Sequence, residues 1–597
     1  MKHISHALAA LAICADLQAQ VTERVSTGSS GQQGAFPAQF SLPSTSVISS
    51  DGRLVAFSTA TAFAAGDTNG VWDVFVHDRL AATTECMSIN LSGVPGNDIS
   101  GVYGIAMSAD GRFVAFESRA SDLVAGDTNG ARDIFVRDQV SGTTELVSMS
   151  TAGVGGNANS LRPAISADGR FVVFASDATN LVASDTNGQL DVFIRDRLSY
   201  TTERVSVSSS GAQGDSYSEY SCVSADGRLV AFESNSTNLV LGDTNGSLDV
   251  FVHDRQTATT VIASVATTGA LANGHSNLPH LSADGRYVSF TSLASNLVQG
   301  DGNGSWDIFV RDLQLGTTVR ASVGNGGLEG IGSSHFSSIS SDGRLVAFTT
   351  TAANFIPGGL HGYTFVRDLR LGTTTLACAA SDGSLPNSGC LLGSMSPDGR
   401  YLAFESTASN LVPGDTNGVY DVFIHDRFAA GFASLCDAGA GNVIDCPCGN
   451  TPSSTGRGCD NSSGTGGASL TASGVAYLST DSLAFTASGE RANATSILLE
   501  GDAFVPAGLV FGQGVRCAGG LLKRLYARNA VGGAVTMPEL GLGDPTVSTR
   551  SAQLGLAIQP GQARYFLVYY RDPLVLGGCP SASTFNATQT GAVTYWP

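Results

Sequence analysis

The chain has 597 residues, of which 42% are hydrophobic and only 14% are charged, and its formal net charge is −19. This length exceeds one ordinary domain, and the hydrophobic content suffices for a large buried core. The acidic balance argues against a nucleic-acid partner, because a phosphate backbone requires a basic groove.

Residues 1–19 are typical of a secretory signal peptide. The apolar stretch Ala7–Ala15 is followed by Ala19, a small residue suited to cleavage. This stretch is too short to span a bilayer, and no later segment is long and apolar enough, so we expect no transmembrane segment. Cys14, which follows an apolar run, leaves a lipoprotein signal as the alternative. We expect an exported protein, either secreted or held in the periplasm or cell envelope.

A Ser-x-Asp-Gly-Arg turn followed by a short alternating strand recurs seven times between residues 20 and 435. The copies lie 56–59 residues apart, with Asp-Gly pairs at Asp51-Gly52, Asp110-Gly111, Asp168-Gly169, Asp226-Gly227, Asp284-Gly285, Asp342-Gly343 and Asp398-Gly399. A fixed period of this length is the signature of a repeat architecture.

One repeat, residues 224–282, predicts four short strands. They are Arg228–Phe232, Asp249–Asp254, a strand around Thr260–Ser264 and a strand that ends at Leu281. Asp-Gly and Asn-Gly turns separate them, which favours one antiparallel sheet per unit. Seven such sheets in sequence predict a radial β-propeller, because each sheet can bury its faces only against its neighbours.

The two ends of the repeat region predict how the ring closes. Val21–Ser26 closely matches Thr201–Ser206, the outer strand of an internal unit. The last unit keeps its inner strands but has a degraded outer strand at Phe428–Leu435. We therefore expect the N-terminal strand to pair with the last unit, which would tie the two ends together.

Two segments of the last unit, Ser396–Phe404 and Asp421–Asp426, resemble the WD-like repeats of TolB-type β-propellers. The resemblance recurs in all seven units and covers residues 21–435. It implies a propeller, a fold that serves as a scaffold, as a binding platform or as an appendage of peptidases. This chain departs from the usual pattern in its longer units and in an added Asp-Thr-Asn-Gly loop in nearly all of them.

That loop places oxygen-bearing side chains at relative positions 1, 3 and 7, with a Gly for the bend. Such spacing is what a hard cation such as Ca²⁺ requires, although no terminal Glu completes the loop. The alternative is a structural turn, since Asp and Asn cap turns through the backbone. The six triads are Asp67/Asn69/Asp73, Asp127/Asn129/Asp133, Asp185/Asn187/Asp191, Asp243/Asn245/Asp249, Asp301/Asn303/Asp307 and Asp415/Asn417/Asp421. Calcium is the only cofactor we expect, and the sixth unit, with Gly358–Gly362 instead, is a natural control.

After the propeller, residues 436–469 predict a Cys-, Gly- and Ser-rich linker and residues 470–597 a small β-sandwich. No helical period stands out there. Disulfides are favoured over zinc in an exported chain, because no His lies nearby. The cysteines expected to pair are Cys436, Cys446, Cys448, Cys459, Cys517 and Cys579, with a local bridge expected between Cys378 and Cys390. This region resembles C-terminal modules of other exported bacterial repeat proteins.

No motif of a known catalytic site is present, such as a Gly-x-Ser-x-Gly elbow or a phosphate loop. His77, His253 and His425 occupy a position that holds Arg in other units, which predicts a solvated strand position. The variable stretches Asn97–Tyr103, Asp215–Tyr220 and Asn273–His280 are expected to share one face with the Asp-Thr-Asn-Gly loops. Variable loops on a rigid scaffold are where recognition usually occurs.

We therefore expect an all-β chain: a seven-bladed β-propeller followed by a small disulfide-containing β-sandwich. The function expected from the residues is that of a monomeric, non-enzymatic binding or scaffold protein with a protein or glycan ligand. A hydrolase or lyase that acts on glycans or peptides from the loop-rich face is the alternative. Singular acidic residues clustered with an unpaired His or Arg around the axis would favour the enzyme.

Overall fold

The computed structural model describes most of the chain between residues 21 and 595. The residues outside the description are 1–20, 40–46, 65, 357–361, 382, 428–432, 437, 440–442, 455, 474–475, 477, 479–480, 482, 560–561, 575–583 and 596–597. Contacts divide the chain into two compact units, Thr22–Arg427 and a second that includes Phe428–Pro597. The predicted signal peptide lies outside the described residues.

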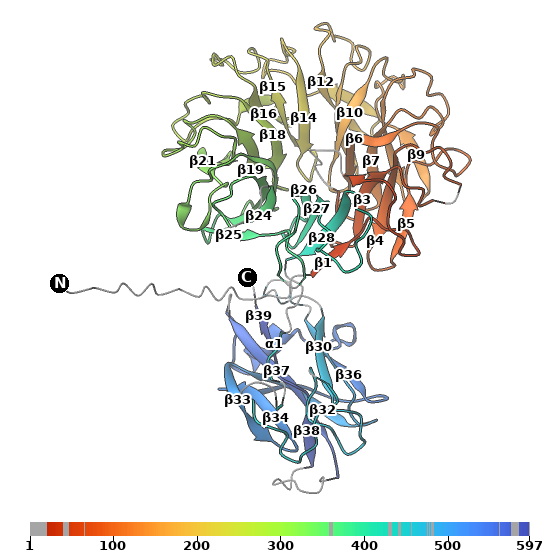
Figure 1. The fold of residues 1–597 in the computed structure, drawn as a ribbon. Coiled ribbons are helices and arrows are strands. Elements are labelled where there is room, and N and C mark those ends of the chain that lie inside the picture. The colour runs from red at the N-terminus through yellow and green to blue at the C-terminus, as the bar shows by residue number, and fades with distance from the viewer. Residues whose placement is uncertain are drawn as a thin grey trace, which may run out of the picture. The chain divides into compact units, whose positions relative to one another are not determined.

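The described residues of the first unit form seven four-stranded antiparallel sheets (Figure 1). The first three are β2 (Ala38–Gln39), β3 (Leu54–Thr59), β4 (Asp73–Asp78) and β5 (Thr83–Cys86); β6 (Ser100–Met107), β7 (Phe113–Ser118), β8 (Asp133–Asp138) and β9 (Thr143–Leu146); and β10 (Ser160–Ile165), β11 (Phe171–Ser176), β12 (Asp191–Asp196) and β13 (Thr201–Arg204). The fourth and fifth are β14 (Ser218–Val223), β15 (Leu229–Ser234), β16 (Asp249–Asp254) and β17 (Thr259–Ile262); and β18 (Ser276–Leu281), β19 (Tyr287–Ser292), β20 (Asp307–Asp312) and β21 (Thr317–Arg320).

The sixth and seventh sheets complete the series. They are β22 (Ser334–Ile339), β23 (Leu345–Thr350), β24 (Tyr363–Asp368) and β25 (Thr373–Leu376); and β26 (Cys390–Met395), β27 (Tyr401–Ser406), β28 (Asp421–Asp426) and β1 (Val21–Arg24). A short 3₁₀ turn, η1 (Asn325–Gly327), precedes β22. The first strands of successive sheets contact one another from β6 to β26, so they line a common axis and the unit is a β-propeller.

Each predicted fourth strand belongs to the sheet that follows it. The strand that ends at Leu281 pairs with β19, the strand after the next Asp-Gly turn. The Asp-Gly turn is thus a hairpin inside a sheet, and the variable stretches connect one sheet to the next. The four strands predicted per repeat are confirmed, but their grouping into sheets shifts by one strand.

The Ser-x-Asp-Gly-Arg turn is held by its own side chains. In the first sheet Ser49 Oγ donates to Asp51 Oδ1 (2.6 Å), and Arg53 N donates to the same oxygen (3.0 Å). Gly52 has φ +72°, the left-handed region that suits Gly. The Arg53 guanidinium then reaches Asp78 at the end of the third strand (2.6 Å). The equivalent Arg–Asp pair is present in all seven sheets.

The ring closes as the sequence predicts. β1 is the outer strand of the seventh sheet and pairs with β28. Thr22 Oγ1 donates to Ala379 O (2.5 Å), as Thr202 Oγ1 does to Met149 O of its own preceding sheet. Ser26 Oγ donates to Asp421 Oδ1 (2.5 Å). The interpretation of 428–435 as a degraded outer strand is wrong, because β29 (Ala433–Ser434) pairs with β39 (Gly591–Thr594) of the second unit.

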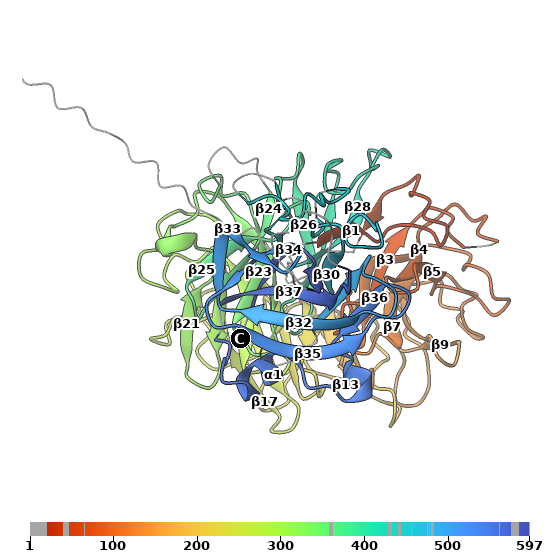
Figure 2. The ribbon, with the colours of Figure 1, turned by 90° about the horizontal axis from the view of Figure 1, so that it is seen from below.

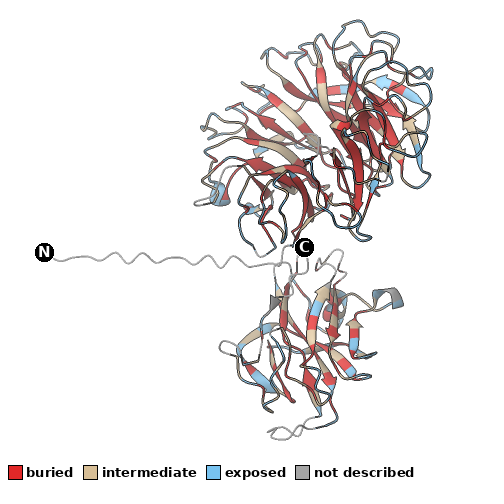
Figure 3. Ribbon diagram, turned by 45° about the vertical axis from the view of Figure 1, so that its right-hand side comes forward, coloured by how far each residue is buried: buried red, intermediate tan, exposed pale blue. Residues whose placement is uncertain are grey.

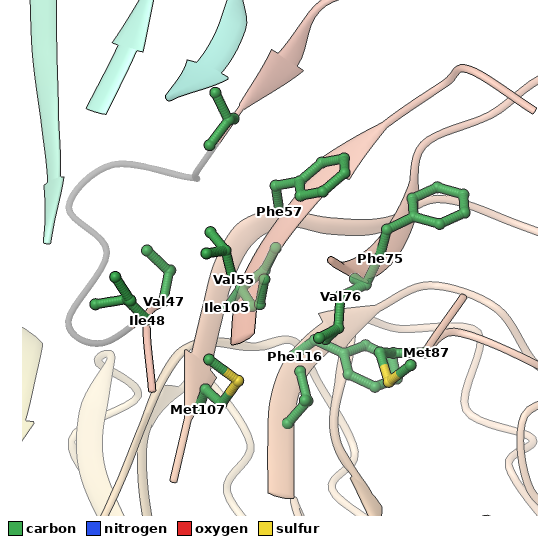
Figure 4. Packing of buried hydrophobic residues seen from close by; sticks show 14 of the residues in the cluster. Val47, Ile48, Val55, Phe57, Phe75, Val76, Met87, Ile105, Met107 and Phe116 are labelled. Carbon is green, nitrogen blue, oxygen red and sulfur yellow. The ribbon is translucent and has the colours of Figure 1, made fainter. Parts of the chain in front are cut away.

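Buried residues occupy most of the strands (Figure 3), and the apolar residues among them make up the core. A Phe on the second strand stacks on a Phe of the third strand in every sheet, as Phe57 does on Phe75 with 6.1 Å between ring centroids. Figure 4 shows this pair beside Ile105 and Phe116 of the next sheet. Each sheet therefore packs its Phe pair against its neighbour.

The His position on the third strand is buried, so the predicted solvated position is wrong. His77, His253 and His425 are at most 7% exposed. His425 Nδ1 lies 2.7 Å from Thr22 Oγ1, whose own hydrogen goes to Ala379 O, so the ring nitrogen must donate. Arg occupies the position in other sheets because it also donates to this Thr, as Arg195 does to Thr202 (3.1 Å).

The second unit is also built mainly of strands (Figure 2). Its largest sheet holds β29, β39, β37 (Ala563–Arg571), β32 (Thr495–Gly501) and β35 (Lys523–Asn529), with β38 (Phe585–Ala587) beside β37. The smaller sheets are β30 (Ser469–Ser473), β31 (Ala484–Ser488) and β36 (Ala534–Met537); and β33 (Ala503–Phe511) with β34 (Gly514–Gly519).

Sequence patterns missed two short helices of this unit, η2 (Leu540–Leu542) and α1 (Val547–Gln553). At seven residues, α1 is too short to show a clear helical period. No helix among the described residues has the length and apolar character needed to cross a membrane.

Disulfides connect the Cys-rich segment to the strands of the second unit. Cys436 pairs with Cys517 and Cys446 with Cys459, while Cys448 is also disulfide-bonded. The prediction of paired cysteines is confirmed for these five, and Cys579 lies outside the described residues. Because Cys517 belongs to β34, the segment predicted as a linker is covalently attached to the fold.

Removal of a single hydroxyl tests the closure of the ring. We expect Ser26→Ala to lower the free energy of unfolding by about 1–3 kcal/mol, because the buried Asp421 loses a hydrogen-bond donor. Thermal or urea unfolding measures the change. Ser206→Ala is the matched control, since Ser206 makes the same bond to Asp191 (2.5 Å) inside a continuous sheet. Equal losses would support closure, whereas a neutral Ser26→Ala would show that the N-terminal strand is detached.

Peptide mapping by mass spectrometry tests the disulfides. Without reduction, we expect fragments that join Cys436 to Cys517 and Cys446 to Cys459, because the fold places the Cα atoms of each pair 5.9 and 5.6 Å apart. Alkylation of Cys436 or Cys446 in the native, unreduced protein would contradict this assignment.

Candidate functional site

The Asp-Thr-Asn-Gly loops, one of which has Gly302 in place of Thr, connect the second and third strands of six sheets, and each is fixed by its own Asn. Asn69 Nδ2 donates to Asp73 Oδ2 (3.0 Å) and to Gly96 O (2.8 Å), while Asn69 Oδ1 accepts from Val71 N (3.0 Å). Gly96 directly precedes the predicted variable stretch Asn97–Tyr103, so the loop lies beside the start of that stretch. Both polar atoms of the amide are thus engaged by the protein.

The last Asp of each triad is buried at the start of the third strand. Asp73 Oδ1 accepts from Ser88 Oγ (2.6 Å), and burial raises the pKa of Asp73 to about 6. The Asn–Asp and Ser–Asp bonds recur in all six triads, through Asn129, Asn187, Asn245, Asn303 and Asn417 and through Ser148, Ser206, Ser264, Ser322 and Ser26. The structural turn is therefore realised in every one of these loops.

Calcium binding by the loops stays a prediction, and the loops are of two kinds. In three of them an Arg lies between the two carboxylates: Arg24 with Asp415 and Asp421, Arg204 with Asp185 and Asp191, and Arg320 with Asp301 and Asp307. The loops of Asp67, Asp127 and Asp243 lack this Arg. Within the described residues, no three His, Cys, Asp or Glu side chains are grouped so that they could hold a metal ion.

The sixth sheet has neither the buried Asp nor the Ser that bonds to it in the other sheets. Tyr363 stands where the other sheets have the last Asp, and Cys378 replaces the Ser, with its Sγ accepting from Thr364 N (3.4 Å). Cys378 and Cys390 are both buried and free, so the predicted local bridge between them is wrong. Each thiol fills a position that holds Ser in other sheets. Residues 357–361 of the predicted control loop lie outside the description.

A second candidate site lies on the propeller axis. The first strands β10, β14, β18 and β22 each carry a bulge, and a residue of each bulge has positive φ. These residues are Arg162 (φ +56°), Tyr220 (+45°), Leu278 (+52°) and Phe336 (+53°), at equivalent positions in four successive sheets. Positive φ strains any residue with a Cβ, and such strain concentrates at functional sites. All four residues line one axial pocket.

Arg162 organises the charged side of the pocket. Its guanidinium lies 3.8 Å from the ring centroid of Tyr220 and forms an ion pair with Glu219. Arg162 Nη2 also donates to Tyr220 Oη (2.8 Å). A planar guanidinium that stacks on an aromatic ring while it donates to a carboxylate is held in one orientation.

A second carboxyl, that of Glu233, lies opposite Glu219. Glu233 on β15 is the direct cross-strand partner of Glu219 on β14, and Glu233 Oε2 accepts from Leu278 N (2.9 Å) at the neighbouring bulge. Burial raises the pKa of Glu233 to about 8, and the negative charge of Glu219 adds to the shift. Burial also raises the pKa of Glu219, against the effect of Arg162. The raised pKa of Glu233 favours its protonated form at neutral pH.

The pocket is shallow. Its enclosed volume is about 20 Å³, room for one water molecule. Ser221 lies in its wall, and Ser221 Oγ is buried with no hydrogen-bond partner among the described residues. Toward the Asp-Gly turns, a second cavity of about 120 Å³ is lined by residues of all seven sheets. A ligand would therefore lie over the axial opening and place one group inside.

Sequence reasoning found part of this site. In the predicted variable stretch Asp215–Tyr220, Tyr220 lines the pocket and Glu219 pairs with Arg162, whereas Asp215 accepts from Thr237 N and Oγ1 (both 2.8 Å). Leu278 falls in the predicted variable stretch Asn273–His280, whereas Arg162 and Phe336 were missed. The sequence feature that could have identified residues 162, 220, 278 and 336 is their spacing: they recur every 58 residues, each with a different side chain.

Comparisons with known proteins concern the fold. No protein-family model and no curated protein matches the chain. Solved structures with a similar fold include an oligogalacturonate lyase from Vibrio parahaemolyticus, with 11% identity and a TM-score of 0.41 over 68% of this chain and 97% of that one. TolB from Acinetobacter baumannii has 13% identity and a TM-score of 0.30 over 60% of each chain. A putative TolB from Agrobacterium tumefaciens has 16% identity and a TM-score of 0.29 over 46% and 78%. These low scores carry no argument about activity.

The raised pKa of Glu233 predicts how stability varies with pH. Folding raises this pKa from its ordinary 4.5 to about 8, so between these values the folded state binds a proton that the unfolded chain has released. Stability should therefore fall as pH rises from about 5 to 8. Glu233→Gln, which mimics the protonated acid, should weaken that dependence when Tm is measured across this range. Glu85→Gln at an exposed position is the control, and an unchanged pH profile for Glu233→Gln would contradict the assignment.

Proposed function

We propose that this chain is an exported binding protein whose ligand lies over the axial pocket of the propeller. The observation that carries the proposal is the row of strained bulge residues Arg162, Tyr220, Leu278 and Phe336. The Phe pairs, which serve the scaffold, keep one residue type in all seven sheets. These four positions share a strained backbone and differ in side chain, which is typical of recognition on a repeated scaffold.

The lining of the pocket favours a glycan or a peptide as ligand. Phe336 and Leu278 offer apolar surface, and beside them stand the Arg162–Glu219 pair and the unpaired hydroxyl of Ser221. Apolar faces bordered by a few oriented polar groups are typical of small-molecule and side-chain recognition. The formal charge of −19 argues against a nucleic acid.

Export is supported by the disulfides. Cys436–Cys517 and Cys446–Cys459 are structural bridges of a kind that forms in oxidising compartments. This agrees with the signal peptide expected at residues 1–19. Both features support a compartment outside the cytoplasm.

A hydrolase or lyase is the second candidate function, and one observation favours it. Glu219 and Glu233 face each other, and burial keeps a proton on Glu233 at neutral pH. A buried carboxyl with a raised pKa beside a second carboxyl is an arrangement found in the general acid and base pairs of glycan-cleaving sites. Against it, Arg162 is paired with Glu219 rather than free for a substrate.

An array of glycans and secreted-protein peptides, probed with the purified full-length protein, tests the proposal. We expect Arg162→Gln and Phe336→Ser each to weaken binding of the array ligand at least about tenfold, as anchor residues in recognition sites do. Tyr200→Ser is the matched control, because Tyr200 is aromatic, exposed and has φ +60° but lies away from the pocket. Equal binding by all three variants would exclude the axial pocket.

The same ligand separates the two functions. An enzyme should release cleaved product, visible by chromatography, and Glu233→Gln should abolish that release while it leaves binding within a few fold. A binding protein should return the ligand intact.

A further inference from the structure

The two kinds of Asp-Thr-Asn-Gly loop differ at one residue of the outer strand. In the loops of Asp185, Asp301 and Asp415, an Arg Nη1 lies 3.1–3.5 Å from Oδ1 of the first Asp. The same Nη1 lies 3.4–3.6 Å from Oδ2 of the last Asp. A guanidinium therefore balances both carboxylates. In the other three loops Cys86, Leu146 and Ile262 stand in its place.

A second position changes together with the Arg. The Arg loops have Gln33, Gln213 or Glu329 on the adjoining stretch, and Glu329 contacts Arg320 (2.8 Å) while Gln213 Nε2 donates to Asp185 Oδ1 (3.1 Å). The Arg-free loops have Pro95, Gly155 and Leu271 at the equivalent bridge positions. The Arg loops thus have a guanidinium beside their carboxylates, whereas the Arg-free loops have residues without charge there.

One of the Arg-free loops has a carboxylate oxygen without a partner. Asp243 is only 8% exposed, and its Oδ1 makes no hydrogen bond to any described residue. In the three Arg loops, the equivalent Oδ1 of the first Asp contacts the guanidinium. Burial raises the pKa of Asp243 and takes that of Asp249 to about 6. Two buried carboxylates without a counter-charge are unfavourable unless a proton or a cation joins them.

We propose that the loop of Asp243 binds a hard divalent cation in the place that Arg occupies in the three Arg loops. Asp243 Oδ1 and Asp249 Oδ2 are its two anionic ligands, and water supplies the remaining oxygens. Asp249 Oδ2 also accepts from Asn245 Nδ2 (2.7 Å), and Asp191 Oδ2 shows that this oxygen can serve an Asn and a cation together. Exposed Gly242 and Thr244 leave the loop open to solvent.

The charge count sets the expected affinity. Two carboxylates and no third acidic ligand suit the range of extracellular calcium modules, with Kd on the order of 0.1–1 mM. Mg²⁺ should bind more weakly, since it requires near-octahedral geometry and gives up its water reluctantly. The site is independent of the axial pocket, so neither proposal depends on the other.

Calorimetric titration of Ca²⁺ into the EDTA-treated, dialysed full-length protein tests this site. We expect Asp243→Asn, which preserves the turn, and Ile262→Arg, which supplies the missing guanidinium, each to remove one equivalent of bound Ca²⁺. The loops of Asp67 and Asp127 share the apolar backing, so the readout is the difference between variant and parent. Asp185→Asn is the matched control and should leave the Ca²⁺ stoichiometry unchanged.

The reverse exchange adds a second test. Arg204→Ile with Gln213→Leu reproduces the Ile262 and Leu271 surroundings in the third sheet and should add one equivalent of bound Ca²⁺. The proposal is overturned if the parent binds no Ca²⁺, or if Asp243→Asn and Ile262→Arg bind as much as the parent. Should Ile262→Arg fail to fold, Asp243→Asn alone decides.

Discussion

A four-stranded sheet with apolar side chains on both faces is stable only between two other sheets. Every sheet of the propeller has this property, because its Phe pair and the flanking Val and Ala residues are buried from both sides. An open row would leave two faces in water, so the fold depends on a contact between its first and last sheets. The N-terminal strand provides it, because Ser26 holds this strand in the seventh sheet through Asp421 while Glu23 of the same strand pairs with Arg79 of the first sheet.

The repeat also separates residues that hold the scaffold from residues free to differ. Arg53 and its six equivalents pair with the Asp at the end of the third strand, and the His or Arg beside it donates to an outer-strand Thr. These side chains contact one another in the same way from sheet to sheet. The axial bulges differ from these contacts. Their backbone has the same positive φ in four sheets, but the side chains at that position are all different: Arg162, Tyr220, Leu278 and Phe336.

Most of the fold could be predicted because its determinants are local. Ser49, Asp51 and Gly52 form the turn by themselves, and the match of Val21–Ser26 to an internal strand identifies the closing strand. What could not be predicted depends on contacts remote in sequence. Arg162 contacts Glu219 only because β10 and β14 belong to neighbouring sheets. His425 is buried against Thr22, which lies at the other end of the chain. A positive φ at a strand bulge cannot be predicted from composition or from the repeat period.

The closing strand also affects the order in which the propeller folds. The bond from Ser206 to Asp191 spans 15 residues, whereas its counterpart from Ser26 to Asp421 spans 395. Loop-closure entropy makes the longer contact about 3 kcal/mol less favourable to form from an unfolded chain. Internal hairpins and sheets should therefore form first, and the ring should close last. Until residue 421 has emerged, the first sheet has no partner on one side, so an exported chain would need protection of that face while it crosses the membrane.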